Sequence, residues 1–134
     1  MYEDKQQIGD CTLYLGDCMD VMPTLGEIDA IVCDPPYGIG VDKKMSEVSG
    51  KKPGNALAHK RHYDATNWDN KPVSDDLIKY LLKISKYQVI FGGNYYNLPP
   101  TSCWLIWDKQ NGDNYFADCE MAWTNLNKAV RKID

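Results

Sequence analysis

Short apolar runs closed by turn residues mark the first part of the chain. Residues 30–33 form such a run without polar alternation, and it stops at Asp34-Pro35-Pro36. A run too short for a helix and followed by prolines predicts a buried parallel strand. Residues 11–15 predict an earlier strand that ends at Gly16-Asp17. Ligands of open α/β sheets bind beyond the carboxyl ends of strands, so the residues from Asp34 onward are expected to face a substrate.

Two helical patterns accompany these strands. A short helix follows Asp17, whose carboxylate can cap it, and Pro23 limits its length. Ser74 opens a longer amphipathic helix, and its inward side carries Leu77, Ile78, Leu81, Leu82 and Ser85. Both helices are expected to flank a sheet.

The last third of the chain predicts three more strands. Residues 88–91 form an apolar run that ends at Gly92-Gly93. Residues 102–107 and 119–124 read as an antiparallel hairpin at one edge of the sheet. The tail, 128–134, is short and charged and suggests no further domain.

Composition indicates a small globular protein. The chain has 134 residues, 43% of them hydrophobic and 11% aromatic, which predicts one domain over residues 1–134. The net charge of -4 excludes a generally basic DNA-binding protein but allows a local basic patch. Five scattered cysteines without a Cys-x-x-Cys pair indicate reduced side chains in a cytoplasmic protein. The polar amino terminus and the lack of a long apolar stretch argue against export and membrane spanning.

Residues 38–72 differ from the rest in composition. They contain glycines, Pro53 and several basic residues, among them Lys43, Lys44, Lys51, Lys52, Lys60 and Arg61. This pattern predicts a mobile basic loop. The loop is either a solvated surface segment or a closing element whose lysines contact phosphates around an extruded base. His59 and His62 lack a third ligand nearby, so no metal site is predicted.

The sequence Asp34-Pro35-Pro36-Tyr37 resembles the catalytic tetrapeptide of S-adenosylmethionine-dependent amino-methyltransferases, which methylate the exocyclic nitrogen of adenine or cytosine in DNA. Upstream, Leu13-Tyr-Leu-Gly-Asp-Cys18 looks like the corresponding segment of bacterial and phage enzymes whose catalytic part precedes the cofactor-binding part. The resemblance covers residues 12–125. It implies an α/β fold with an incomplete Rossmann-like methyltransferase sheet, flanking helices and a carboxy-terminal antiparallel hairpin.

The resemblance also assigns roles to single residues. The catalytic group is Asp34, Pro35, Pro36 and Tyr37, and the residues beside S-adenosylmethionine are Asp17, Cys18, Asp34 and Pro35. Asp17 either caps its helix, lies by the adenine of the cofactor, or does both. The substrate side comprises Tyr37, Lys43, Lys44, Asn94, Tyr95 and Lys109.

Two of these substrate-side assignments have simpler alternatives. Asn94, Tyr95 and Tyr96 either line the target pocket or pack as loop residues. Lys109, in the segment Trp107-Asp-Lys109, either faces the substrate or is an ordinary exposed loop lysine.

The residue types suit methylation of an amine. The exocyclic nitrogen of a nucleobase is a poor nucleophile because its lone pair is delocalised into the ring. A carboxylate at Asp34 and the carbonyl of Pro35 can each accept one N–H and turn the lone pair out of conjugation. Tyr37 offers a flat face for stacking of the flipped base. This chemistry requires no metal.

Two parts of such an enzyme are missing from the sequence. It has no glycine-rich Phe-x-Gly-x-Gly loop and no target-recognition region, and Gly92-Gly93 follows the wrong strand for the cofactor loop. In the family's sheet, two strands from the missing half lie between the strand ending at Asp17 and the strand ending at Asp34. The amino-terminal strand therefore repacks, two chains associate as a homodimer, or a companion chain supplies the missing half.

Three functions follow as hypotheses. The first is the catalytic half of a DNA methyltransferase, adenine-directed because Asp-Pro-Pro-Tyr is the form usual for adenine. The second is a truncated, inactive remnant or an accessory subunit that binds DNA or a partner. The third is methylation of RNA or of a protein amide with a similar loop.

Overall fold

The computed structural model describes residues 2–41, 43, 66–110 and 117–134. They form a mixed α/β structure rich in strands, with a five-stranded sheet, a separate two-stranded hairpin and few helices. Within these ranges, no helix has the length and apolar character needed to cross a membrane.

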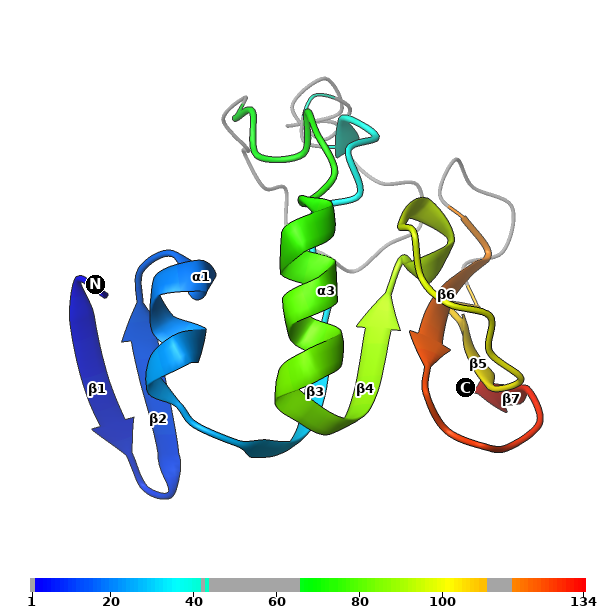
Figure 1. Ribbon diagram of the computed structural model, residues 1–134. Helices are drawn as coiled ribbons and strands as arrows, with labels where there is room; N and C mark the ends of the chain where they lie inside the picture. Colours follow the sequence, from blue (N-terminus) through cyan, green and yellow to red (C-terminus); the bar gives the residue numbers. More distant parts are fainter. Residues whose placement is uncertain (1, 42, 44–65, 111–116) are drawn as a thin grey trace.

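The amino-terminal residues form a β-hairpin that stands apart from the main sheet (Figure 1). β1 (Asp4–Ile8) pairs antiparallel with β2 (Cys11–Leu15), and α1 (Cys18–Val21) follows. Asp17 caps α1, its Oδ1 accepting from the backbone N–H of Met19 at 2.8 Å. The predicted strand and cap are confirmed. β1 was not expected, because most of its residues are polar and exposed.

The main sheet mixes parallel and antiparallel pairs. Its strands lie in the order β3 (Ile28–Cys33), β4 (Ser85–Phe91), β6 (Cys119–Thr124), β5 (Trp104–Asp108) and β7 (Arg131–Ile133). β3 is parallel to β4, β6 is antiparallel to both of its neighbours, and β7 is parallel to β5. The predicted parallel strand before Asp34 and the antiparallel hairpin are therefore confirmed.

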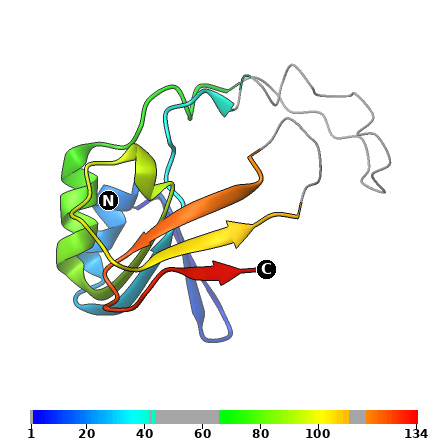
Figure 2. The ribbon, with the colours of Figure 1, turned by 90° about the vertical axis from the view of Figure 1, so that its right-hand side faces the viewer.

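The prediction that the hairpin forms the edge of the sheet is wrong. β7 lies outside β5, although its sequence looks like a charged tail (Figure 2). Lys132 of β7 pairs with Asp108 at 2.9 Å and with Asp134 at 2.8 Å. Charged side chains on an edge strand discourage pairing with a further strand. A charged sequence is therefore compatible with β7 as the edge strand.

One helix, α3 (Asp75–Ile84), covers a face of β3 and β4 (Figure 1). Ser74 caps it by accepting a backbone N–H of the first turn at 3.2 Å. Ile78 and Leu81 are buried and pack with Ile31 of β3 in the core. Ser85, predicted on the inward side of the helix, instead begins β4, because the backbone is already extended there with φ -134° and ψ 154°.

β2 and β3 do not pair with each other. In the described part of the chain, β2 pairs with β1 and β3 pairs with β4, so each strand leaves one edge of backbone N–H and C=O groups without a strand partner. Val32, in β3, is 71% exposed. The short 3-10 turn η1 (Met22–Thr24) leads from α1 toward β3. The pairing of β2 with β1 corresponds to the arrangement in which the amino-terminal strand repacks. In the described part of the chain, one edge of β3 has no strand partner.

Candidate active site

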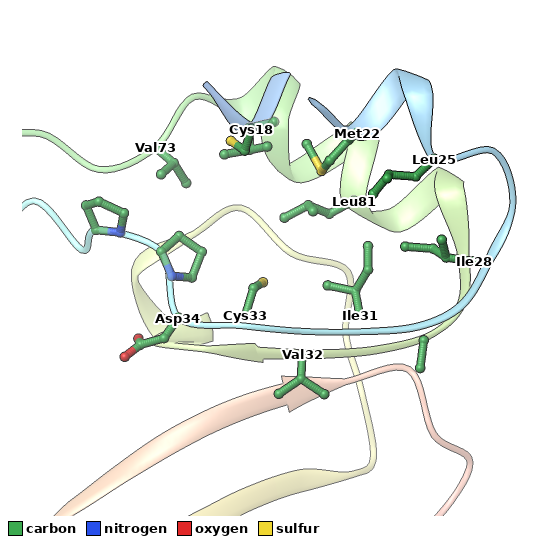
Figure 3. Close-up of a pocket in the computed structure, with 14 residues that line it drawn as sticks. Cys18, Met22, Leu25, Ile28, Ile31, Val32, Cys33, Asp34, Val73 and Leu81 are labelled. Atoms are coloured by element: carbon green, nitrogen blue, oxygen red, sulfur yellow. The ribbon is translucent and has the colours of Figure 1, made fainter. Parts of the chain in front are cut away.

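Asp34 stands at the carboxyl end of β3 with an exposed side chain. Figure 3 shows its carboxylate turned away from the cavity, whereas Ile31 and Cys33 point toward the helices. Asp34 Oδ1 accepts a hydrogen bond from the Tyr37 hydroxyl at 2.5 Å. Among the described residues, no lysine or arginine forms an ion pair with Asp34. The carboxylate is therefore accessible and retains acceptor capacity.

The two prolines are fixed by donors from other elements. The Tyr96 hydroxyl lies 2.7 Å from the carbonyl oxygen of Pro35 and 3.2 Å from that of Pro36. The backbone N–H of Val73 also donates to the Pro36 oxygen, at 3.3 Å. Prolines have no N–H of their own, so these contacts anchor the segment. The hydrogen bond from Tyr96 therefore holds the Pro35 carbonyl, and Pro35 directly follows Asp34 in the chain.

The ring of Tyr37 lies against the loop that follows β4. Tyr95 stacks on it, with ring centroids 5.0 Å apart and planes 14° apart, and Tyr96 meets it edge-on at 6.4 Å. Gly92 has φ +66°, and a Cβ there would lie 2.1 Å from Cε1 of Tyr37. Glycine at position 92 therefore allows both the left-handed backbone and the close approach of the Tyr37 ring.

The two ends of the basic segment, 38–72, are joined by hydrogen bonds. Asp69 is 1% exposed, and its carboxylate accepts from the backbone N–H groups of Gly38 and Val41, each at 2.8 Å. A buried carboxylate thus satisfies the backbone there, and the mobility of the segment stays a prediction. Residues 44–65 lie outside the described part of the chain. No pattern around Asp69 distinguishes it in the sequence from a solvated loop acid.

Lys109 forms an ion pair with Glu120 of β6. The side chain of Lys109 is 22% exposed, so it is neither an ordinary surface lysine nor an unpaired cation. Burial and the hydrogen bond to Asp34 raise the pKa of Tyr37, and the charge of Glu120 adds to this rise. The ion pair therefore lies close enough to the Tyr37 side of the site for electrostatic interaction.

The remaining predicted substrate residues are less closely tied to the site. Asn94 lies in η2 (Gly93–Tyr95) and is exposed, as is Lys43. Lys44, His59 and His62 lie outside the described residues. Within the described ranges, no three His, Cys, Asp or Glu side chains are grouped so that they could hold a metal ion.

A cavity of about 470 Å³ separates α1 and η1 from β3 and α3 (Figure 3). Its lining is mostly aliphatic and includes Cys18, Asp34 and Pro35, three of the residues assigned to the cofactor. The fourth, Asp17, caps α1. Burial raises the pKa of Cys33 to about 11, and the charges of Asp34 and Cys18 contribute to the rise.

S-adenosylmethionine, which the resemblance implies, presents a carboxylate, an ammonium group, a ribose and an adenine. The described lining of the cavity includes one residue with a charged side chain, Asp34, whose carboxylate points away from the cavity (Figure 3), and no lysine, arginine or glycine. An anionic carboxylate would therefore meet no cationic side chain there. The described residues do not fit the whole cofactor.

The chain matches no family model, and no curated protein or solved structure is significantly similar to it.

Proposed function

We propose that this chain is the catalytic part of an S-adenosylmethionine-dependent DNA methyltransferase that acts on the exocyclic amine of adenine. One observation carries the proposal. Asp34 and Pro35 place two acceptors in succession at the carboxyl end of a parallel strand, and Asp34 is hydrogen-bonded to Tyr37, whose ring stacks on Tyr95. The resemblance of residues 34–37 to the family's tetrapeptide supplies the substrate class.

The acceptor pair can activate an amine. An adenine amino group has two N–H bonds, and two fixed acceptors can take one each. Holding both bonds rotates the lone pair out of the ring plane, where it becomes nucleophilic. The carboxylate of Asp34 then stabilises the positive charge that develops on nitrogen, and such preorganised groups are worth about 3 to 4 kcal/mol.

The stacked tyrosines suit a planar base. Tyr95 is 46% exposed, so a base can reach this pair from solvent. Stacking of a base on an aromatic ring is worth about 1 to 3 kcal/mol. The hydroxyl of Tyr37 must first leave Asp34, because it occupies one of the oxygens that the amine requires.

The order of the strands supports a division of the enzyme into two parts. In the resembling family, two strands of the cofactor-binding half separate the counterparts of β2 and β3, and here these two strands are unpaired with each other. The cofactor supplies an electrophilic methyl group when it is bound. Because the described residues do not fit the whole cofactor, we propose that a companion chain helps to hold it.

Methyl transfer to DNA tests the proposal. We would measure incorporation of labelled methyl groups into adenine-containing DNA by the chain alone and with the polypeptide encoded next to it. Asp34→Ala should lower the rate at least a hundredfold, because the acceptor for one N–H and the counter-charge are both lost. Asp76→Ala is the matched control, since Asp76 is an exposed residue of α3. Equal rates for native protein and Asp34→Ala would overturn the mechanism.

An inactive outcome has its own signature. If the chain is a remnant or an accessory subunit, calorimetry should detect no cofactor binding by the chain or by the mixture, even at millimolar concentration. Transfer to RNA or to a glutamine peptide but not to DNA would replace the DNA substrate with the third hypothesis.

A further inference from the structure

Tyr96 connects two distant parts of the site. Its hydroxyl reaches the carbonyl of Pro35 at 2.7 Å, although the two residues are 61 positions apart. Its ring packs against the core cluster that contains Ile31 and Leu81. The hydroxyl is therefore carried by a ring with a fixed place in the core, not by a mobile surface side chain.

The carbonyl of Pro35 needs such a partner. A proline ring fixes φ, but ψ sets the direction of the carbonyl, and a residue before proline still covers a range of about 40° in ψ. The neighbouring Pro36 has no N–H that could form a local turn. The Tyr96 hydroxyl, 2.7 Å from the Pro35 oxygen, restricts ψ of Pro35 to values that keep this hydrogen bond. The oxygen has a second lone pair, which can accept from another donor.

The protonation state of Tyr96 suits this role. Burial, with smaller contributions from the charges of Asp34, Cys33 and Asp69, raises the pKa of its hydroxyl above the ordinary tyrosine value. The hydroxyl therefore stays a donor across the neutral range. It also lies edge-on to Tyr37, so one residue contacts both the acceptor carbonyl and the stacking ring.

We propose that Tyr96 is a positioning residue that aims the Pro35 carbonyl at the substrate amine, and that it thereby determines discrimination between bases with and without an exocyclic amino group. This inference rests on the proposed function. If the Pro35 carbonyl were misdirected, the base could still stack on the tyrosine rings. Removal of the Tyr96 hydroxyl should therefore weaken recognition of the amino group and leave the stacking unchanged. The matching substitution is Tyr96→Phe, which retains the ring and its packing.

The hydrogen bond can be tested directly. With carbonyl-¹³C and ¹⁵N proline, one-bond carbonyl-to-nitrogen correlations arise from Pro35-Pro36 and Pro99-Pro100 alone. In Tyr96→Phe the Pro35 carbonyl should move upfield, because it loses a donor. The Pro99 carbonyl, which accepts from the Trp123 indole at 2.7 Å, is the internal reference. An unmoved Pro35 signal would overturn the inference.

Amine recognition is tested with two single-stranded oligonucleotides that differ at one base, adenine or unsubstituted purine. The full chain should bind the adenine form more tightly, and Tyr96→Phe should reduce that preference by roughly tenfold, the worth of one hydrogen bond. Tyr87→Phe, the same change on an exposed tyrosine of β4, should keep it.

The outcomes separate the two proposals. If native protein prefers adenine and Tyr96→Phe retains the preference, the positioning role is wrong and the proposed function stands. If native protein shows no preference, the proposed function fails, and the positioning role fails with it. If Tyr96→Phe and Tyr87→Phe lose the preference equally, the loss is not specific to Tyr96, which also counts against the inference.

Discussion

The hydroxyl of Tyr37 lies 2.5 Å from Asp34 Oδ1, so the carboxylate proposed to receive an amine already holds a phenol. The same phenol belongs to the ring that stacks on Tyr95. Ring and hydroxyl therefore have opposite effects on substrate entry. The ring offers a stacking surface, whereas the hydroxyl competes for the acceptor.

Two substitutions separate these effects. Tyr37→Phe should tighten binding of an adenine-containing oligonucleotide roughly fivefold, since a hydrogen bond worth about 1 kcal/mol need no longer break. Tyr37→Ala should weaken it by about 1 to 3 kcal/mol, because the stacking surface is lost. Fluorescence anisotropy would measure both. If Phe weakened binding as much as Ala, the hydroxyl would be a substrate contact and not a competitor.

Asp69 should be important for stability despite its place in a polar segment. Asp69→Ala leaves the partly buried N–H groups of Gly38 and Val41 without the Asp69 carboxylate as acceptor, at a cost of about 1 to 3 kcal/mol in the free energy of unfolding. Urea denaturation would measure the change. Asp76→Ala, at an exposed site, should stay within about 0.5 kcal/mol. A small effect of Asp69→Ala would mean that water replaces the carboxylate.

Gly92→Ala should displace Tyr37. The added Cβ would meet the tyrosine ring, and the positive φ costs a further 1 to 2 kcal/mol, approximately. Gly9→Ala is the matched control, because Gly9 has φ +56° and no atom within 4 Å of its Cβ position. Both variants should lose stability, but methyl transfer should fall in Gly92→Ala alone. Equal activity of the two variants would show that the tyrosine tolerates movement.

The thiols should differ in reactivity. With its pKa raised to about 11, Cys33 is almost entirely protonated at pH 8, whereas an ordinary exposed thiol with a pKa of about 8.5 is partly ionised. Mass spectrometry after iodoacetamide treatment should show labelling of the exposed Cys11 and Cys119 first. Cys33 labelling should rise as pH increases toward 11. Early labelling of Cys33 would indicate that the cavity opens in solution.

The same shift predicts a pH dependence of stability. The pKa of Cys33 in the folded state lies above its unfolded value of about 8.5. The stability that the protonated thiol contributes to the folded state is therefore fully present below about pH 8.5. It is lost as the pH rises from about 9 toward 11. The midpoint of urea denaturation should fall over this range, and the fall should be smaller in Cys33→Ala. An equal fall in both proteins would assign the effect to other groups, such as the tyrosines.

Periodicity predicted the elements whose residues bury an apolar face. The stripe of α3 is an example. β3 was predicted instead from a short apolar run that ends at two prolines, and of this run Ile31 is buried whereas Ala30 and Val32 are exposed. β1 and β7 escaped prediction because their residues are exposed and polar, so pairing alone makes them strands. Their partners lie elsewhere in the chain, and local sequence does not specify them.

The site followed the same rule. Residues 34–37 were predicted because a motif of four neighbours is visible in the sequence. Asp69 reaches Gly38 across 31 positions, and no local pattern marks it. Tyr96 was a candidate pocket residue, but its hydrogen bond to Pro35, 61 positions away, could not be predicted from local sequence. The ion pair of Glu120 with Lys109 forms only when β5 and β6 lie together.

The hydrogen bonds between Asp69 and the residues after Tyr37 have a consequence for the length of the chain between them. The backbone N–H of Gly40 donates to the Asp69 carbonyl at 3.0 Å, so the chain leaves and rejoins the site at almost one point. A peptide inserted between two such anchors changes the closure entropy slowly, by about 0.6 kcal/mol for each doubling of its length. Changes in the length of the chain between these anchors should therefore cost little stability, and the tetrapeptide should keep its geometry.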